Sequence, residues 1–105
     1  MGKESGEQGP TMIVVWSPRA VRHLVALREY IARDSLRSAA DIAARILESV
    51  ELLATHPEMG RPGRVLGTRE LVVTNTPYVI PYRVKGQRRE IIAVFHGRQM
   101  WPERM

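Results

Sequence analysis

The sequence of 105 residues contains no cysteine. Disulfide bonds and thiolate metal sites are therefore excluded, and a cytosolic location becomes the default expectation. No apolar run reaches the ~18–20 residues that a membrane-spanning helix requires, and Met1–Thr11 has no apolar segment like that of a secretory signal peptide. No metal-ligand spacing stands out, and no glycine-rich phosphate loop leads from a strand into a helix. We therefore expect no metal and no cofactor.

The length allows one domain, and an apolar content of 44% is enough for a modest single core. The chain is basic, with a net charge of +5 and an isoelectric point of about 10.4. This balance either favours acidic partners, such as nucleic acid, a ribosome surface or an acidic protein, or reflects composition alone. We interpret Met1–Thr11 as a disordered extension or a remnant of cloning, and 12–105 as the single domain.

The first structural signal is a run of apolar, largely β-branched residues, Met12–Trp16, which predicts a buried strand. Ser17 can cap a helix with its hydroxyl, and Pro18 suits the first helical position. Apolar residues then recur at helical spacing from Arg19 to about Arg33. We therefore predict a strand that leads directly into a capped amphipathic helix.

A second amphipathic pattern follows the short turn Asp34–Arg37. Ser38 stands three residues before Asp41, a spacing similar to that of a capping box, and the apolar stripe continues to about His56. Pro57 disfavours helical geometry at the residue before it and so marks the helix end. Two helices joined by so short a turn are expected to form an antiparallel hairpin.

A basic connector separates this helical half from the rest of the chain. Its glycines and prolines break the helical pattern, because glycine tolerates unusual dihedral angles and proline lacks an amide donor. Its arginines place fixed positive charge around the break: Arg61, Arg64 and Arg69. Beyond the connector the apolar period changes from helical to alternating, which indicates a sheet.

Three alternating segments predict an antiparallel meander: Arg69–Asn75, Tyr78–Lys85 and Glu90–His96. Pro81 lies inside the second segment and suggests an edge strand or a bulge, because proline cannot donate to the ladder. Gly86–Arg89 is interpreted as a four-residue hairpin loop. With that loop, strand alternation would place Arg83 on the same face as His96.

The whole chain thus predicts an α+β fold of order β-α-α-β-β-β, in which an N-terminal strand and an antiparallel helix hairpin pack on a small, mainly antiparallel sheet. This order resembles the toxins of the RelE/ParE superfamily from prokaryotic type II toxin–antitoxin systems. The resemblance spans Met12 to Pro102 and is carried by an ordered set of motifs: Trp16-Ser17-Pro18, Met59-Gly60-Arg61, Arg69-Glu70-Leu71, Pro77–Val84, and His96-Gly97-Arg98 ahead of Trp101-Pro102.

The resemblance implies a small toxin that a cognate antitoxin binds and neutralises in a hetero-oligomer, with no role for a membrane. It leaves the target open, since ParE-like members inhibit DNA gyrase whereas RelE-like members cut mRNA in the ribosomal A site. The overall pattern of the sheet motif favours ParE-like gyrase inhibition, and a ribosome-dependent endoribonuclease is the alternative. A degenerate member whose arginines merely hold an antitoxin is a third alternative.

Metal-free RNA cleavage requires a base for the 2′-hydroxyl, cations for the phosphorane and an acid for the leaving oxygen. Some RelE-like nucleases combine a histidine near the end of the last strand with an arginine on the sheet and a glutamate, and His96 and Arg83 match the first two. Further candidates, with the glutamate left open between two positions, are Arg61, Arg64, Tyr82, and Glu58 or Glu70. His96 is read equally well as a strand-end hydrogen bonder. Lys85 is the single lysine of the sheet half, unlike members that use a lysine cluster.

Two binding surfaces complete the prediction. For a gyrase-binding toxin, the residues expected to contact the target come from the connector and the C-terminal tail: Arg61, Arg64, Arg98 and Trp101. The antitoxin is expected to cover an apolar patch on the sheet face away from the helices, as an added strand or helix. The residues predicted for that patch are Val72, Val79, Ile92 and Val94.

Overall fold

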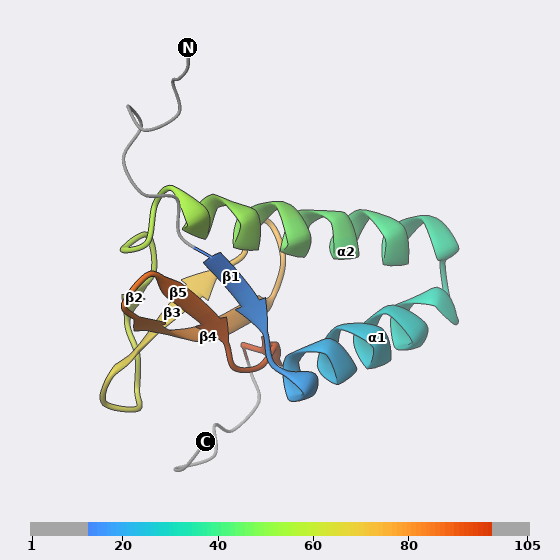
Figure 1. Cartoon of the computed structure of the whole chain (residues 1–105). Helices are drawn as coiled ribbons and strands as arrows, with labels where there is room; N and C mark the ends of the chain where they lie inside the picture. The colour runs from blue at the N-terminus through green and yellow to red at the C-terminus, as the bar shows by residue number, and fades with distance from the viewer. Residues whose placement is uncertain (1–12, 98–105) are drawn as a thin grey trace.

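The helices and strands follow the predicted order, and a computed structural model describes them over residues 13–97. The predicted extension Met1–Thr11 and the candidate residues Arg98 and Trp101 lie outside the described residues. Figure 1 shows the two helices as one antiparallel pair beside the sheet. In chain order the elements are β1 (Ile13–Trp16), α1 (Pro18–Ala32), α2 (Leu36–Glu51), the 3₁₀ turn η2 (Leu52–Ala54), β2 (Arg61–Pro62), β3 (Thr68–Val72), β4 (Tyr78–Lys85), β5 (Arg88–Ile91) and β6 (Phe95–His96).

These strands form one sheet in the order β1-β5-β4-β3-β2, with β6 also paired to β4. β1 runs parallel to β5, and the other pairings are antiparallel. The predicted α+β class, a helix hairpin on a mainly antiparallel sheet, is confirmed. The short β2 was not predicted, and the last predicted strand is split into β5 and β6. The predicted burial of the first strand was wrong: Ile13 is 58% exposed and the other residues of β1 are half-buried, because β1 lies at the sheet edge.

Both helices begin at a serine N-cap. Ser17 caps α1 as predicted, since its hydroxyl accepts a hydrogen bond from the backbone N–H of Ala20 (3.0 Å). The predicted cap of α2 was one turn too late: Ser35 is the N-cap, and its hydroxyl accepts from the backbone N–H of Ser38 (3.1 Å). Ser35 fits because its backbone is extended just before the first helical residue, whereas Ser38 already lies within the helix.

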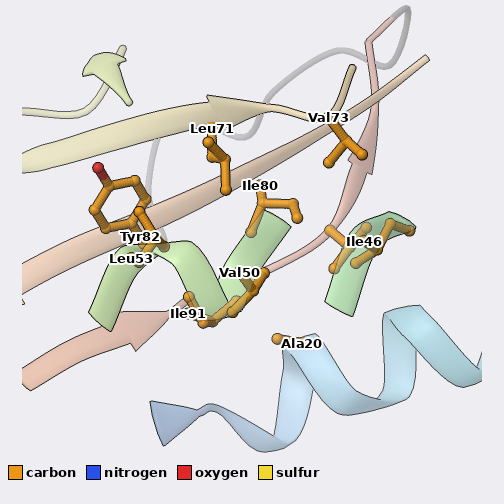
Figure 2. Close-up of a cluster of buried hydrophobic side chains, with 10 residues drawn as sticks. Ala20, Ile46, Val50, Leu53, Leu71, Val73, Ile80, Tyr82 and Ile91 are labelled. Atoms are coloured by element: carbon orange, nitrogen blue, oxygen red, sulfur yellow. The ribbon is translucent and has the colours of Figure 1, made fainter. Parts of the chain in front are cut away.

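The core lies between the helices and one face of the sheet, here called the helix face. Figure 2 shows the side chains that meet there from α1, α2, η2, β3 with the residue after it, β4 and β5: Ala20, Ile46, Val50, Leu53, Leu71, Val73, Ile80, Tyr82 and Ile91. Each is 4% exposed or less. Burial of a large apolar side chain contributes about 1.5–3 kcal/mol, so this cluster fixes how the helices pack on the sheet.

The turn between β4 and β5 is shorter than predicted. Lys85 pairs with Arg88, which leaves a two-residue turn, so the four-residue loop was wrong. Gly86 has a φ of 58°, a conformation that glycine adopts without strain and that tight hairpin turns need. In this register Arg83 pairs with Glu90.

A β-bulge interrupts the chain between β5 and β6. Tyr82 of β4 pairs with Ile91, but farther along the same strand Val79 pairs with Phe95. Between these pairs β4 contributes two residues, whereas the facing chain contributes the three residues 92–94. One residue is therefore extra, which shifts the register by one.

The bulge decides which face carries His96. A shift of one residue moves the side chains that follow it to the other side of a strand. His96 therefore pairs with Tyr78 on the helix face. Arg83 and Glu90 lie on the opposite side, here called the outer face, together with Glu70. The expectation that Arg83 and His96 share a face was wrong.

Pro81 lies in β4, a central strand, so the edge position that it suggested was wrong, whereas the bulge lies directly opposite. Its carbonyl accepts a hydrogen bond from the backbone N–H of Ile92 (2.9 Å), and in such a pair the Ile92 carbonyl would receive the N–H of residue 81. Proline has no N–H to donate, and the Ser17 hydroxyl donates to that carbonyl instead (3.0 Å). The residue that caps α1 thus also satisfies the carbonyl that the proline leaves open.

Candidate functional site

The connector folds into a short hairpin, here called the connector hairpin, formed by Arg61–Glu70. The Glu70 side chain is 2% exposed. Its carboxylate accepts two hydrogen bonds from the Arg61 guanidinium (3.0 and 3.3 Å) and one from the backbone N–H of Arg64 (3.0 Å). The Arg64 Nε lies 3.7 Å from the second carboxylate oxygen. Because charge-assisted hydrogen bonds are strong, this buried carboxylate fixes both arms of the hairpin.

The base of the connector hairpin is fixed from the helix face. The Tyr82 hydroxyl donates to the Pro57 carbonyl (2.8 Å) and accepts from the backbone N–H of Gly60 (3.0 Å). The Arg69 guanidinium donates to the Gly60 carbonyl (2.6 Å). A Cβ at position 60 would collide with the Tyr82 ring and with the backbone of Glu70, so glycine is required there. Tyr82 is fully buried, and its hydroxyl serves this junction.

Positive charge gathers on the outer face. The side chains of Arg61 and Arg64 are 55% and 53% exposed, although both interact with Glu70. Arg83 lies on the same face and lines a hollow of about 220 Å³ together with Arg19 and Glu90. Guanidinium groups bind carboxylates and phosphates in a fixed planar geometry. The outer face can therefore bind an anionic group of a partner.

A second concave surface, here called the α1–β6 groove, has a volume of about 600 Å³. Its lining comes from α1 on one side and from β4, β6 and the bulge on the other, and includes His23, Tyr30, Arg33, Tyr78, Phe95 and His96. The Tyr78 and His96 rings meet edge to face with centroids 5.7 Å apart. Burial, and then the nearby Tyr30, raise the pKa of Tyr78 above its usual 10.0.

His23 connects α1 to the bulge. Its Nδ1 accepts a hydrogen bond from the backbone N–H of Val94 (3.1 Å), which requires that nitrogen to carry no proton. Its ring also lies 5.5 Å from that of Phe95. Desolvation, followed by the charges of Arg19 and Arg22, lowers the pKa of His23 from its usual 6.5. The neutral ring is therefore the form that fits the fold.

The structure does not bring the predicted catalytic pair together. Arg83 lies on the outer face, whereas His96 lies on the helix face against Tyr78. Of the two candidate glutamates, Glu70 is buried in the connector hairpin and Glu58 is exposed. Joint action of Arg83 and His96 on one phosphate would have to cross the sheet.

The four residues predicted to bind the antitoxin do not form one exposed patch. Val79 and Val94 are buried, Ile92 is half-buried, and Val72 is 49% exposed. Other large apolar side chains are exposed on α1 and at the tip of the connector hairpin: Val21, Val25, Tyr30 and Leu66. Apolar surface for a partner is therefore more abundant there than on the outer face.

Sequence reasoning missed two parts of these surfaces. The hydrogen bond between His23 and Val94 joins positions 71 residues apart, and no local sequence pattern predicts it. The exposure of Leu66 had a usable signal, because an apolar residue within a turn segment faces solvent. Within residues 13–97 no group of ionisable side chains could hold a metal ion, and no helix is long and apolar enough to cross a membrane.

Known proteins resemble this chain in both sequence and fold. Residues 14–101 match the family described as ParE toxin of type II toxin-antitoxin system, parDE. The chain is 46% identical to Y4kP, a protein of Sinorhizobium fredii named as a putative toxin, over 88 aligned residues. The alignment covers 84% of this chain and 91% of Y4kP. It is 38% identical to toxin RelE2 of Caulobacter vibrioides over 87 aligned residues, which make up 83% of this chain and 97% of RelE2.

A solved structure agrees with these sequence relationships. A chain of the chromosomal ParDE toxin–antitoxin system from P. aeruginosa superposes with a TM-score of 0.75 at 28% identity, over 82% of this chain and 96% of that chain. The family match covers most of the sequence, and the relatives are matched over almost their whole length. The chain belongs to the family of ParE toxins of type II toxin–antitoxin systems.

Proposed function

We propose that this toxin arrests growth by binding and inhibiting DNA gyrase, and that a cognate antitoxin neutralises it. The observation that supports a binding toxin over a nuclease is the separation of Arg83 from His96 by the sheet. Acid–base catalysis requires both groups within hydrogen-bond reach of the same phosphodiester. An inhibitor that acts by binding needs no such convergence.

An antitoxin partner is supported by membership of a toxin–antitoxin family and by the likeness to the ParDE chain of P. aeruginosa. The exposed apolar residues of α1 and the basic outer face give such a partner both apolar and charged contacts. The four valine and isoleucine positions predicted from the sequence stay a proposal, and among them Val72 is the accessible one.

A RelE-like, ribosome-dependent endoribonuclease is the second candidate. The arrangement that favours it is the set of cations on the outer face, Arg61, Arg64 and Arg83, which could stabilise a phosphorane. The name of the relative RelE2 points the same way. The form of this alternative predicted from the sequence uses Arg83 and His96, which lie on opposite faces of the sheet, so substitution of each residue tests it directly.

The experiment is transcript-end mapping in cells shortly after induction of the toxin, with plasmid supercoiling measured on the same cultures. Gyrase inhibition predicts intact transcripts and loss of negative supercoiling. Cuts phased with codons in translated mRNA, at normal supercoiling, would contradict the proposal and support the nuclease. Arg83→Ala and His96→Ala sharpen the result, because a nuclease that uses both loses toxicity with either, whereas a gyrase inhibitor keeps it with His96→Ala.

A further inference from the structure

The tip of the connector hairpin presents an apolar side chain entirely to solvent. Leu66 is 100% exposed, more than any other large hydrophobic residue in the described part of the chain. Figure 1 shows this loop in yellow-green at the lower left, on the side of the sheet away from the turn between the helices. Single exposed leucines are common on protein surfaces, so the way in which this loop holds its leucine matters.

Hydrogen bonds close the loop on both sides of Leu66. The backbone N–H of Gly63 donates to the Thr68 carbonyl (2.8 Å), and the N–H and hydroxyl of Thr68 both donate to the Val65 carbonyl (3.1 and 2.6 Å). A Cβ at position 63 would collide with Thr68. Gly67 has a φ of 85°, which favours glycine. The loop is therefore an ordered turn that displays its apolar tip.

Two guanidinium groups accompany the leucine on the same hairpin. Glu70 fixes the Arg61 side chain and the Arg64 backbone, yet both arginine side chains stay more than half exposed. The buried carboxylate thus orders the hairpin while leaving cations accessible. An apolar tip beside fixed positive charge is a recognition element with two chemically distinct parts.

We propose that Leu66 is the anchor through which the toxin binds its target, and that the target is a protein with an apolar pocket bordered by carboxylates. This inference rests on the proposed function, since it names the surface that contacts the inhibited protein. Insertion of the leucine removes apolar surface from water, while the guanidinium groups pair with the carboxylates. Because the loop is already ordered, binding loses little conformational entropy.

A protein fits this surface better than a nucleic acid does. Most contacts to nucleic acid go to phosphates and base edges, from cations and hydrogen-bonding groups. Arg61 and Arg64 would suffice for such contacts, and a leucine held clear of the rest of the surface would add little. Leu66 therefore separates the two classes of partner experimentally.

The test compares Leu66→Ala and Leu66→Glu with the same two substitutions at Leu36. Leu36 is 78% exposed and begins α2, so it controls for the loss of an exposed leucine and for added negative charge. Neither leucine is buried, and thermal unfolding should confirm that all four variants fold like the wild type. The readouts are inhibition of gyrase supercoiling by the purified toxin and growth arrest at equal expression.

We expect Leu66→Ala to raise the toxin concentration for half-maximal gyrase inhibition about tenfold or more. Leu66→Glu should lose inhibition altogether, because its carboxylate repels the acidic border of the pocket. The Leu36 variants should act as the wild type does. Equal inhibition by Leu66→Glu and the wild type would overturn the anchor and leave gyrase inhibition standing.

Two further outcomes separate the anchor from the proposed function. If the wild type arrests growth without inhibiting gyrase, the proposed target is wrong, and Leu66→Glu must then weaken growth arrest for the anchor to survive. If Arg64→Gln abolishes growth arrest while Leu66→Glu leaves it intact, the hairpin recognises an anionic partner through charge, and the anchor is overturned. A wild type that causes no arrest overturns both.

Discussion

The helix face and the outer face are built on the same strands, yet they treat charge in opposite ways. On the outer face, the buried carboxylate of Glu70 interacts with two arginines that stay half exposed, Arg61 and Arg64. On the helix face, a neutral His23 accepts a backbone N–H, and the buried Arg89 donates to two backbone carbonyls. The outer face thus keeps its cations exposed, whereas the helix face holds one histidine neutral and one arginine buried.

The difference shows how little separates the two surfaces along the chain. Strict alternation would have placed His96 on the same face as Arg83, and one extra residue in the bulge places it on the other face, against Tyr78. The same bulge faces Pro81 and brings the Val94 N–H to His23. One local irregularity therefore leaves Arg83 on the outer face and places His96 in the α1–β6 groove.

The largest effect should come from removal of the carboxylate that organises the outer face. Glu70→Ala leaves the Arg64 N–H without its acceptor and the Arg61 guanidinium without its partner, and we expect a loss of about 2–4 kcal/mol in the free energy of unfolding. Glu70→Gln keeps an acceptor and should lose about half as much. Urea unfolding measures both.

Glu90→Ala is the matched control for this first prediction. Glu90 lies on the same face but is only half-buried, so its loss should change stability by about 0.5 kcal/mol. If Glu70→Ala and Glu90→Ala had equal effects, the outer face would not depend on one buried carboxylate, and the contrast between the two faces would be lost.

The second-largest effect is expected at Ser17, which connects the start of α1 to the sheet. Ser17→Ala removes the N-cap bond to Ala20 and leaves the Ile92 carbonyl unpaired; together these should cost about 2 kcal/mol. In a Pro81→Ala background, the new N–H at position 81 can donate to that carbonyl. Ser17→Ala should then cost about 1 kcal/mol less, and a double-mutant cycle from urea unfolding measures the difference. Additive effects would mean that Ser17 does not compensate for the proline.

Periodicity predicted the elements of both faces but not the contacts between them. The helical and alternating patterns located α1, α2, β3 and β4 because each depends on neighbours within a few residues. Pro81 suggested an edge or a bulge, but the extra residue on the facing chain was not located, because 92–94 is apolar throughout and no polar residue marks the extra position. Ser35 and Ser38 both suit a helix start, and the local pattern does not choose between them.

The candidate site was less predictable than the fold, because its contacts join distant parts of the chain. Arg61 and Arg64 were recognised as fixed charge, but their dependence on Glu70 follows from the pairing of β2 with β3, and the two-residue β2 has no signal of its own. Burial of Val79 and Val94 likewise depends on packing that alternation does not report. The sequence showed which side chains could carry charge or accept protons, whereas only the pairing register of the strands shows which of them lie on the same face.

The third effect tests the neutral histidine of the helix face. The pKa of His23 in the fold lies below the 6.5 of an unfolded chain, so its contribution to stability is complete above about pH 6.5. It is lost as pH falls below that value through the depressed pKa, because the unfolded state then binds the proton more readily. Thermal unfolding of the wild type from about pH 8 to about pH 5 should show this loss.

Two substitutions at His23 separate titration from hydrogen bonding. Asn can offer an acceptor to the Val94 N–H but does not titrate, so His23→Asn should lack this part of the acid destabilisation. Leu offers no acceptor, so His23→Leu should be less stable at every pH. A wild type and a His23→Asn variant with parallel pH profiles would show that the ring is not held neutral by the fold.

The smallest effect is expected at Arg89, a buried cation on the helix face. Within residues 13–97 its guanidinium donates to backbone carbonyls and not to a carboxylate. It is 1% exposed, its guanidinium donates to the Gly86 and Arg88 carbonyls at 3.3 Å, and its Nε has no acceptor. Replacement of a poorly paired buried charge by an apolar side chain is often neutral or stabilising, so Arg89→Met should change the unfolding free energy by less than about 1 kcal/mol. Arg61→Met is the matched variant and should destabilise by about 1–2 kcal/mol, because it leaves Glu70 buried without its main donor. A loss above about 2 kcal/mol for Arg89→Met would mean that the helix face, like the outer face, depends on a paired cation.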